Sequence, residues 1–135
     1  MRKYLLDSNA FADCIFHRRG VDQRVKQSRR QGHIIGTALP VVAEILGGIE
    51  FSQTRERNLL ILNRKLSLFR LWPFTLDVAR EYGRLFAELR RIGRPMQVID
   101  RMIAATARTF SDSIVVTTDT DLSAVPGLKV EDWTK

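Results

Sequence analysis

The stretch KYLLDSNAF (residues 3–11) places a short apolar run directly before an aspartate and two residues that favour the start of a helix. Residues 3–7 are therefore predicted to form a buried strand that ends at Asp7, with a helix beginning at Ser8 or Asn9. The stretch IVVTTDTDL (residues 114–122) repeats this arrangement, because a β-branched run precedes Asp119 and Asp121. Both stretches predict a strand that carries an acidic side chain at its carboxyl end.

The rest of the chain alternates between the periodicity of strands and that of helices. Further strands are predicted at 33–38, 71–74 and 128–130, and further helices at 21–31, from Pro40 onward, at 59–69, 78–89 and 97–109. This alternation predicts an α/β fold with a mostly parallel central sheet flanked by helices, and 135 residues suit a single domain over 1–135. Ligands bind such sheets beyond the carboxyl ends of the strands, where the strand order reverses.

Composition narrows the class of protein. The chain has 22 Lys and Arg against 15 Asp and Glu, a formal charge of +7, which suits a polyanionic partner such as nucleic acid. A basic protein without such a partner is the alternative. Cys14 is the only cysteine, so a disulfide within the chain is excluded and a reducing, cytoplasmic location is expected. No stretch approaches the roughly 18 consecutive apolar residues that a membrane span requires.

Four acidic positions are candidates for one site. They are Asp7 and Asp119 at strand ends, Glu44 within the apolar helix VVAEILGGI, and Asp100 near the start of the helix in VIDRMIAATA, with Asp121 as the alternative to Asp119. Each residue also has a structural interpretation: Asp7 or Asp121 as a cap, Glu44 as a solvated edge residue, and Asp100 as a first-turn acid. Asp119 is preferred over Asp121 because it lies nearer the strand end.

The electrostatic cost of gathering such acids is large. Three carboxylates about 5 Å apart would repel by about 10 kcal/mol in total at an effective dielectric near 20. A small domain has only about 5–15 kcal/mol of stability. Either their pKa values rise or a cation neutralises them, and oxygen ligands favour Mg²⁺ or Mn²⁺.

The ordered set of motifs resembles the PIN-domain nucleases, in particular the VapC-type toxins of bacterial toxin–antitoxin pairs. LLDSNAF, TALPVVAEILGG, VIDRMIAATA and VVTTDTDLSAVPGLKVEDW are similar to the family's motifs in order and spacing, over essentially the whole chain. The resemblance implies that Asp7 and Asp100 are metal ligands, together with some of Glu44, Asp119 and Asp121. The supporting residues that it implies are Ser8, Asn9, Thr37 and Thr118.

The resemblance also implies an activity and partners. The expected reaction is Mg²⁺-dependent cleavage of RNA, most often tRNA and in particular initiator tRNA, leaving a 5′-phosphate and a 3′-hydroxyl. In this mechanism Glu44 orients a water or accepts its proton. Arginines near Asp100 are expected to hold the RNA backbone, namely Arg90, Arg91, Arg94 and Arg101. The expected protein partners are a VapB-type antitoxin and a second copy of the chain.

Three other functions remain open at this point. A metal-free nuclease would need His17 and His33 as acid and base, although His33 falls in or beside a predicted strand. A phosphatase that uses Asp7 as nucleophile would need a second aspartate where Asn9 stands. A non-catalytic RNA-binding module would use the acids only structurally, and would hold RNA without cutting it when Mg²⁺ is added.

Overall fold

Five short strands form one sheet in which every pairing is parallel. The computed structural model covers residues 1–135, and its strands are β1 (Lys3–Leu6), β2 (Ile34–Ala38), β3 (Arg70–Trp72), β4 (Ser113–Val116) and β5 (Val130–Glu131). Their order in the sheet is β3-β2-β1-β4-β5. The predicted α/β class with a parallel sheet is therefore confirmed.

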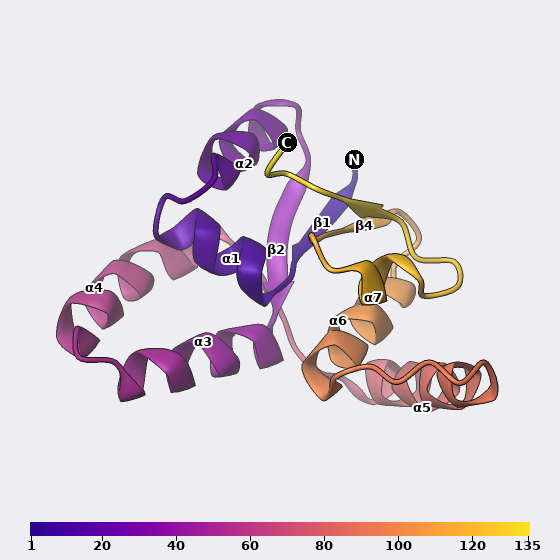
Figure 1. The fold of residues 1–135 in the computed structure, drawn as a ribbon. Helices are drawn as coiled ribbons and strands as arrows, with labels where there is room; N and C mark the ends of the chain where they lie inside the picture. The colour runs from indigo at the N-terminus through magenta and orange to yellow at the C-terminus, as the bar shows by residue number, and fades with distance from the viewer.

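Helices connect and cover these strands (Figure 1). They are α1 (Ser8–Ile15), α2 (Val21–Arg30), α3 (Leu39–Phe51), α4 (Arg55–Lys65), α5 (Leu76–Arg91), α6 (Val98–Arg108) and α7 (Thr120–Ser123), with a 3₁₀ turn at Leu66–Leu68. The sequence prediction missed α7, because it is only one turn long. The predicted helix over 59–69 is instead α4 followed by the 3₁₀ turn. None of the helices combines the length and apolar composition needed to cross a membrane.

The order of the strands reverses between β1 and β4. From β1 the chain builds the sheet in one direction through β2 and β3, and then crosses to the other side of β1 to add β4 and β5. Leu6, the last residue of β1, is in register with Val116, the last residue of β4. The residues that follow these two strands therefore lie together at the switch point, where ligands bind in sheets of this kind.

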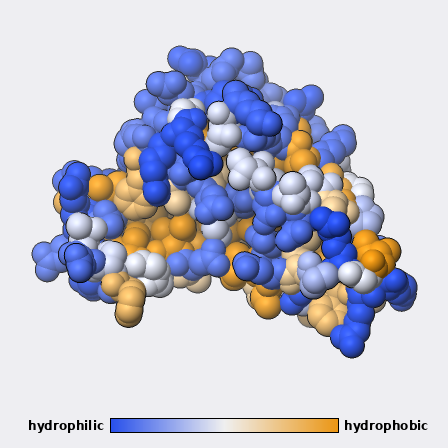
Figure 2. All heavy atoms as spheres, viewed as in Figure 1, coloured by the Kyte–Doolittle hydropathy of each residue, from blue (hydrophilic) through white to orange (hydrophobic).

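The carboxyl end of the sheet is flanked by helices on two sides. Figure 1 shows β1 and β2 running toward the lower edge of the view, with α3 on the left of that edge and α6 on the right. The space-filling view shows a hollow in the lower edge of the molecule, between the side that carries α3 and the side that carries α6 (Figure 2). The carboxyl ends of the strands thus face this hollow, although the strands themselves are buried: Leu5 and Leu6 are fully inaccessible.

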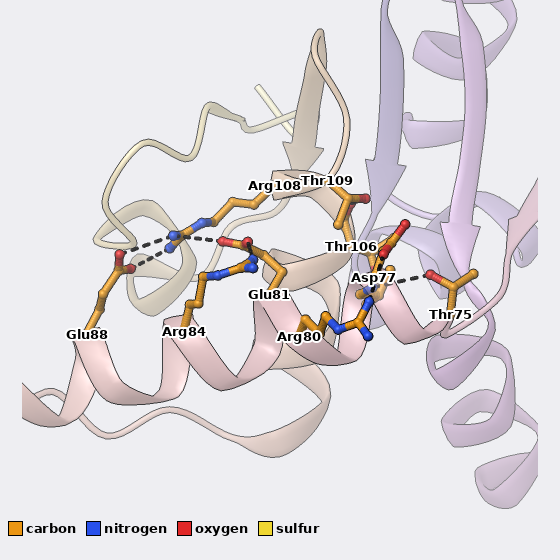
Figure 3. Close-up of polar contacts among 10 residues, drawn as sticks. Thr75, Asp77, Arg80, Glu81, Arg84, Glu88, Thr106, Arg108 and Thr109 are labelled. Carbon is orange, nitrogen blue, oxygen red and sulfur yellow. Dashed lines mark hydrogen bonds and ion pairs between the residues drawn. The ribbon is translucent and has the colours of Figure 1, made fainter.

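An ion-pair network fixes α5 against α6. Arg108, near the end of α6, donates to Glu88 Oε2 (2.6 Å) and Oε1 (3.2 Å), and also lies 2.9 Å from Glu81 Oε1 (Figure 3). Thr75 caps the start of α5 by accepting a hydrogen bond from the backbone N–H of Val78 (3.2 Å). Because a guanidinium that binds two carboxylates holds both in a defined geometry, the network fixes the wall that α5 forms beside α6.

Candidate active site

Asp7 is a buried carboxylate held at the end of β1, with only 4% of its surface exposed. Its Oδ1 accepts a hydrogen bond from the backbone N–H of Ala10 (2.8 Å), which caps α1, and its Oδ2 accepts one from the Thr117 hydroxyl (2.6 Å). Asp7 therefore caps α1, which begins at Ser8 as predicted. Burial raises the pKa of Asp7, a rise that these two hydrogen bonds oppose and the charge of nearby Asp119 reinforces.

Asp100 lies in the first turn of α6 and faces the acids at the strand ends. Burial, the charges of Asp119 and Asp7, a hydrogen bond with Asp119 and the charge of Glu44 together raise the pKa of Asp100 to about 6. The charges of Asp7, Glu44 and Asp119, each from a different segment of the chain, therefore act on Asp100. The assignment of these four acids to one catalytic site stays a prediction.

A chain of hydrogen bonds orders the loop after β4. Asp119 donates its backbone N–H to the Thr117 hydroxyl (2.9 Å), and Asp119 Oδ1 accepts from the backbone N–H of Asp121 (2.8 Å). Asp119 therefore faces Asp100, whereas Asp121 forms an ion pair with Arg94 (3.4 Å). Thr118, predicted as a supporting residue, is exposed, and the buried Thr117 makes the contact with Asp7. Thr117, which was not among the predicted supporting residues, is therefore the threonine that supports Asp7.

Glu44 differs from its prediction in burial. Its place in an apolar helix suggested a buried charge, but Glu44 is exposed, as are the adjacent Ala43 and the two glycines Gly47 and Gly48. The side chain lies at the rim of the site, near enough for its charge to act on Asp100. The alternative of a solvated edge residue is therefore correct for its burial.

The three predicted supporting residues near the strand ends have different environments. Ser8 is half-buried, and its hydroxyl oxygen is buried without any hydrogen-bond partner. Asn9 is exposed. Thr37 is fully buried and donates a hydrogen bond to the Leu6 carbonyl (2.7 Å), so it braces the end of β1 from the neighbouring strand rather than facing the acids.

The donor set suits a hydrated divalent cation. All the acidic donors are carboxylate oxygens, and the unpartnered Ser8 hydroxyl beside Asp7 adds a polar atom that the protein itself leaves unsatisfied. No three acidic, histidine or cysteine side chains lie close enough together to hold a metal ion between them, so the tight three-acid arrangement assumed from the sequence is not formed. Separated carboxylate donors are compatible with a divalent cation that keeps several of its waters.

Three of the four predicted RNA-binding arginines gather at one cavity. Arg90, Arg94 and Arg101 line a cavity of about 310 Å³ between α5 and the start of α6, whereas Arg91 lies outside it. The histidines, in contrast, are engaged elsewhere. His17 Nδ1 is 2.8 Å from Asp22, and His33 Nδ1 accepts from the backbone N–H of Arg2 (3.1 Å). Neither histidine contacts any of the four candidate acids of the site, which removes the basis for a histidine nuclease there.

Comparison with known proteins places this chain in a family. The family model described as PIN domain matches residues 4–128. The chain is 33% identical to the tRNA(fMet)-specific endonuclease VapC of Shigella flexneri, over 98% of this chain and 99% of the relative. It is 27% identical to the endonuclease of the same name from Salmonella typhimurium, with the same coverage.

Solved structures agree with these sequence matches. The DNA-bound VapBC of Salmonella typhimurium matches with a TM-score of 0.86 and 27% identity, over 98% of this chain and 99% of that one. VapBC2 of Rickettsia felis, bound to a DNA fragment from its promoter, matches in fold with a TM-score of 0.87 at 24% identity, over 97% of this chain and 98% of that one. The resemblance inferred from the motifs is therefore confirmed, and the chain belongs to the PIN-domain family, within its VapC-type nucleases.

Proposed function

We propose that this chain is a metal-dependent endoribonuclease that cleaves tRNA, with initiator tRNA as the first candidate, and that it acts as the toxin of a toxin–antitoxin pair. The observation that carries the proposal is the position of Asp7, Asp100 and Asp119 at the β1/β4 switch point, where the pKa of Asp100 rises to about 6. The proposed substrate rests on two relatives that match this chain over almost their full length and are named tRNA(fMet)-specific endonucleases.

Each acid has a role in the proposed site. Asp7, Asp100 and Asp119 would hold Mg²⁺ or Mn²⁺, and they are preferred to Asp121 because Asp121 is paired with Arg94 in this structure. When bound, a divalent cation lowers the pKa of water and neutralises charge on the phosphate. Glu44, exposed at the rim, would orient a water or accept its proton. Thr117 would keep Asp7 ionised, since its hydrogen bond lowers the pKa of that carboxyl.

Cleavage of purified initiator tRNA tests the proposal. With Mg²⁺ we expect cuts that leave a 5′-phosphate and a 3′-hydroxyl, and EDTA should abolish them. Asp7→Asn removes the charge of the most buried acid while keeping its shape, and we expect the cleavage rate to fall by at least about 100-fold. A protein that binds tRNA but leaves it intact in Mg²⁺ and Mn²⁺ would instead be the non-catalytic RNA-binding module.

A VapB-type antitoxin is the proposed protein partner, because the solved relatives are VapBC complexes. A basic side chain from its tail would be attracted to the acids of the site. Hydrophobic atoms are visible on the lobe formed by α1, α3 and α4 (Figure 2), and the exposed Phe51 and Leu60 belong to this α3–α4 region. Such side chains suit a protein interface, either with the antitoxin or in a homodimer. Co-purification with the antitoxin, and the mass of the isolated chain in solution, test these two interfaces.

A further inference from the structure

The cavity between α5 and the start of α6 combines positive charge with an exposed aromatic ring. Arg90, Arg94 and Arg101 line it together with Phe86, whose surface is 41% exposed. Its volume of about 310 Å³ is at the lower end of the range for small-molecule sites, which is roughly 300–1,000 Å³. The cavity is therefore large enough for one small planar ligand.

The positive charge of this cavity is only partly compensated. Arg90 and Arg101 form no ion pair with any carboxylate, and Arg101 instead donates to the Tyr82 hydroxyl (3.0 Å) and to the Met96 carbonyl. Arg94 has one partner, Asp121, at 3.4 Å, and its Nε is buried without a hydrogen-bond acceptor. Buried donors without acceptors are costly, so this lining favours an anion with several oxygens.

Planar groups are layered around Phe86. The guanidinium carbons of Arg90 and Arg101 lie over the Phe86 ring, 6.0 Å and 5.3 Å from its centroid. Unpaired nucleobases stack on aromatic rings and on arginine guanidinium planes in proteins that bind single-stranded RNA. A phosphate-binding lining beside such a layer matches the chemistry of a nucleotide better than that of a simple anion.

The cavity adjoins the acidic site through two connections. Arg101 directly follows Asp100 on α6, and Arg94 pairs with Asp121, whose backbone N–H donates to Asp119. An RNA strand that crosses the acids would therefore reach the cavity within a short distance along its backbone. The ion pairs of Arg108 with α5 hold the cavity wall in place.

We propose that this cavity is a subsite for one unpaired nucleotide of the RNA next to the scissile phosphate, an inference that rests on the proposed nuclease function. The base packs against the layer of Phe86 and Arg90, and the phosphate lies between Arg94 and Arg101. The incoming phosphate competes with Asp121 for Arg94. The subsite thus requires unpaired RNA beside the cleavage point.

Binding measurements in an uncut complex test this subsite. The probe is a fluorescein-labelled RNA hairpin with the initiator-tRNA anticodon loop, and the protein carries Asp7→Asn so that the RNA survives in Mg²⁺. In this background Phe86→Ala should weaken binding at least about fivefold. Arg90→Gln should also weaken it and reduce the salt dependence, log K against log salt, by about 0.7. Arg91→Gln is the matched control, since it removes the same charge from the same helix end outside the cavity.

Two further measurements separate stacking from folding and from charge. Phe86→Leu keeps an apolar side chain but not the ring, and should weaken RNA binding as Phe86→Ala does, with an unchanged melting temperature. A second set of hairpins lacks one base in the loop, each at a different position. At one position, loss of the base should weaken binding to the protein that retains Phe86 but should not weaken binding further after Phe86→Ala. Equal RNA affinity for the Phe86, Arg90 and Arg91 variants would overturn the subsite, and so would loss of antitoxin binding without loss of RNA binding. Cleavage by the protein with Asp7 intact reports separately on the nuclease function.

Discussion

Replacing Asp100 by Asn should stabilise the metal-free protein, even though Asp100 belongs to the proposed active site. The raised pKa of about 6, against an ordinary value of 3.8, means that the folded protein disfavours the ionised form. At full value this difference corresponds to about 3 kcal/mol. Because the carboxyl is only half-buried, solvent screening reduces the expected gain to about 1–2 kcal/mol at pH 7.5.

The pH dependence of this gain has a defined sign. Above pH 6 the Asp100 carboxyl is charged in both the folded and the unfolded chain, so the full penalty on the folded state is present. Between pH 6 and 3.8 the folded state binds a proton that the unfolded state does not yet bind, and the penalty declines. Below pH 3.8 both states are neutral and the stabilising effect of Asp100→Asn should have vanished.

Urea denaturation in EDTA at pH 7.5, 6, 5 and 4 measures this effect, with the fluorescence of the buried Trp72 and Trp133 as the signal. The quantity compared is the difference in unfolding free energy between Asp100→Asn and the unchanged chain. Groups that titrate in the same way in both proteins do not contribute to this difference. Saturating Mg²⁺ should shrink or reverse the difference, because the cation stabilises the chain that retains its ligand. A variant no more stable at pH 7.5, or a gain that does not decline on acidification, would refute the penalty that burial and the neighbouring acids place on the ionised Asp100 carboxyl.

Two other substitutions probe the strand ends and the sheet. Thr117→Val removes the hydroxyl that lowers the pKa of Asp7, so RNA cleavage at pH 7 should fall by at least about tenfold and recover in part at higher pH. A pH–rate profile checks this, and Thr118→Val, which lacks the contact, should have a much smaller effect. Gly36→Ala should destabilise the protein by about 1–3 kcal/mol, because a Cβ on Gly36 would collide with the backbone of β3. Gly48→Ala on α3 meets open space, so urea denaturation should show it neutral or up to about 1 kcal/mol more stable.

Local patterns were sufficient for the elements and for the acids that follow strands. The apolar run before Asp7 and the β-branched run before Asp119 correspond to β1 and β4. They could be predicted because the formation and the end of a strand depend on residues that are adjacent in the chain. The same patterns predicted most helices to within a few residues. They failed for α7 and the 3₁₀ turn, since single turns are stabilised by their surroundings more than by their own sequence.

Burial was the property that sequence patterns judged least well. Glu44 lies among apolar residues along the chain but reaches solvent, because the small residues beside it also face outward. Thr117 was not predicted as a supporting residue, since its burial and its contact with Asp7 depend on how the loop after β4 packs against the end of β1. Neither error could be avoided without knowing which side of each element meets the core.

By itself, the sequence determined the α/β class, the order of the elements, the acidic residues and the surplus of arginine. Only the tertiary structure decided that β1 and β4 are neighbours, that Thr117 holds Asp7, and that Arg90, Arg94 and Arg101 share a cavity that Arg91 does not enter. The physical reason is the range of the interactions. Strand and helix formation depend on nearby residues, whereas the pKa of Asp100 and the charge of the cavity arise from groups that only the packing of distant segments brings together.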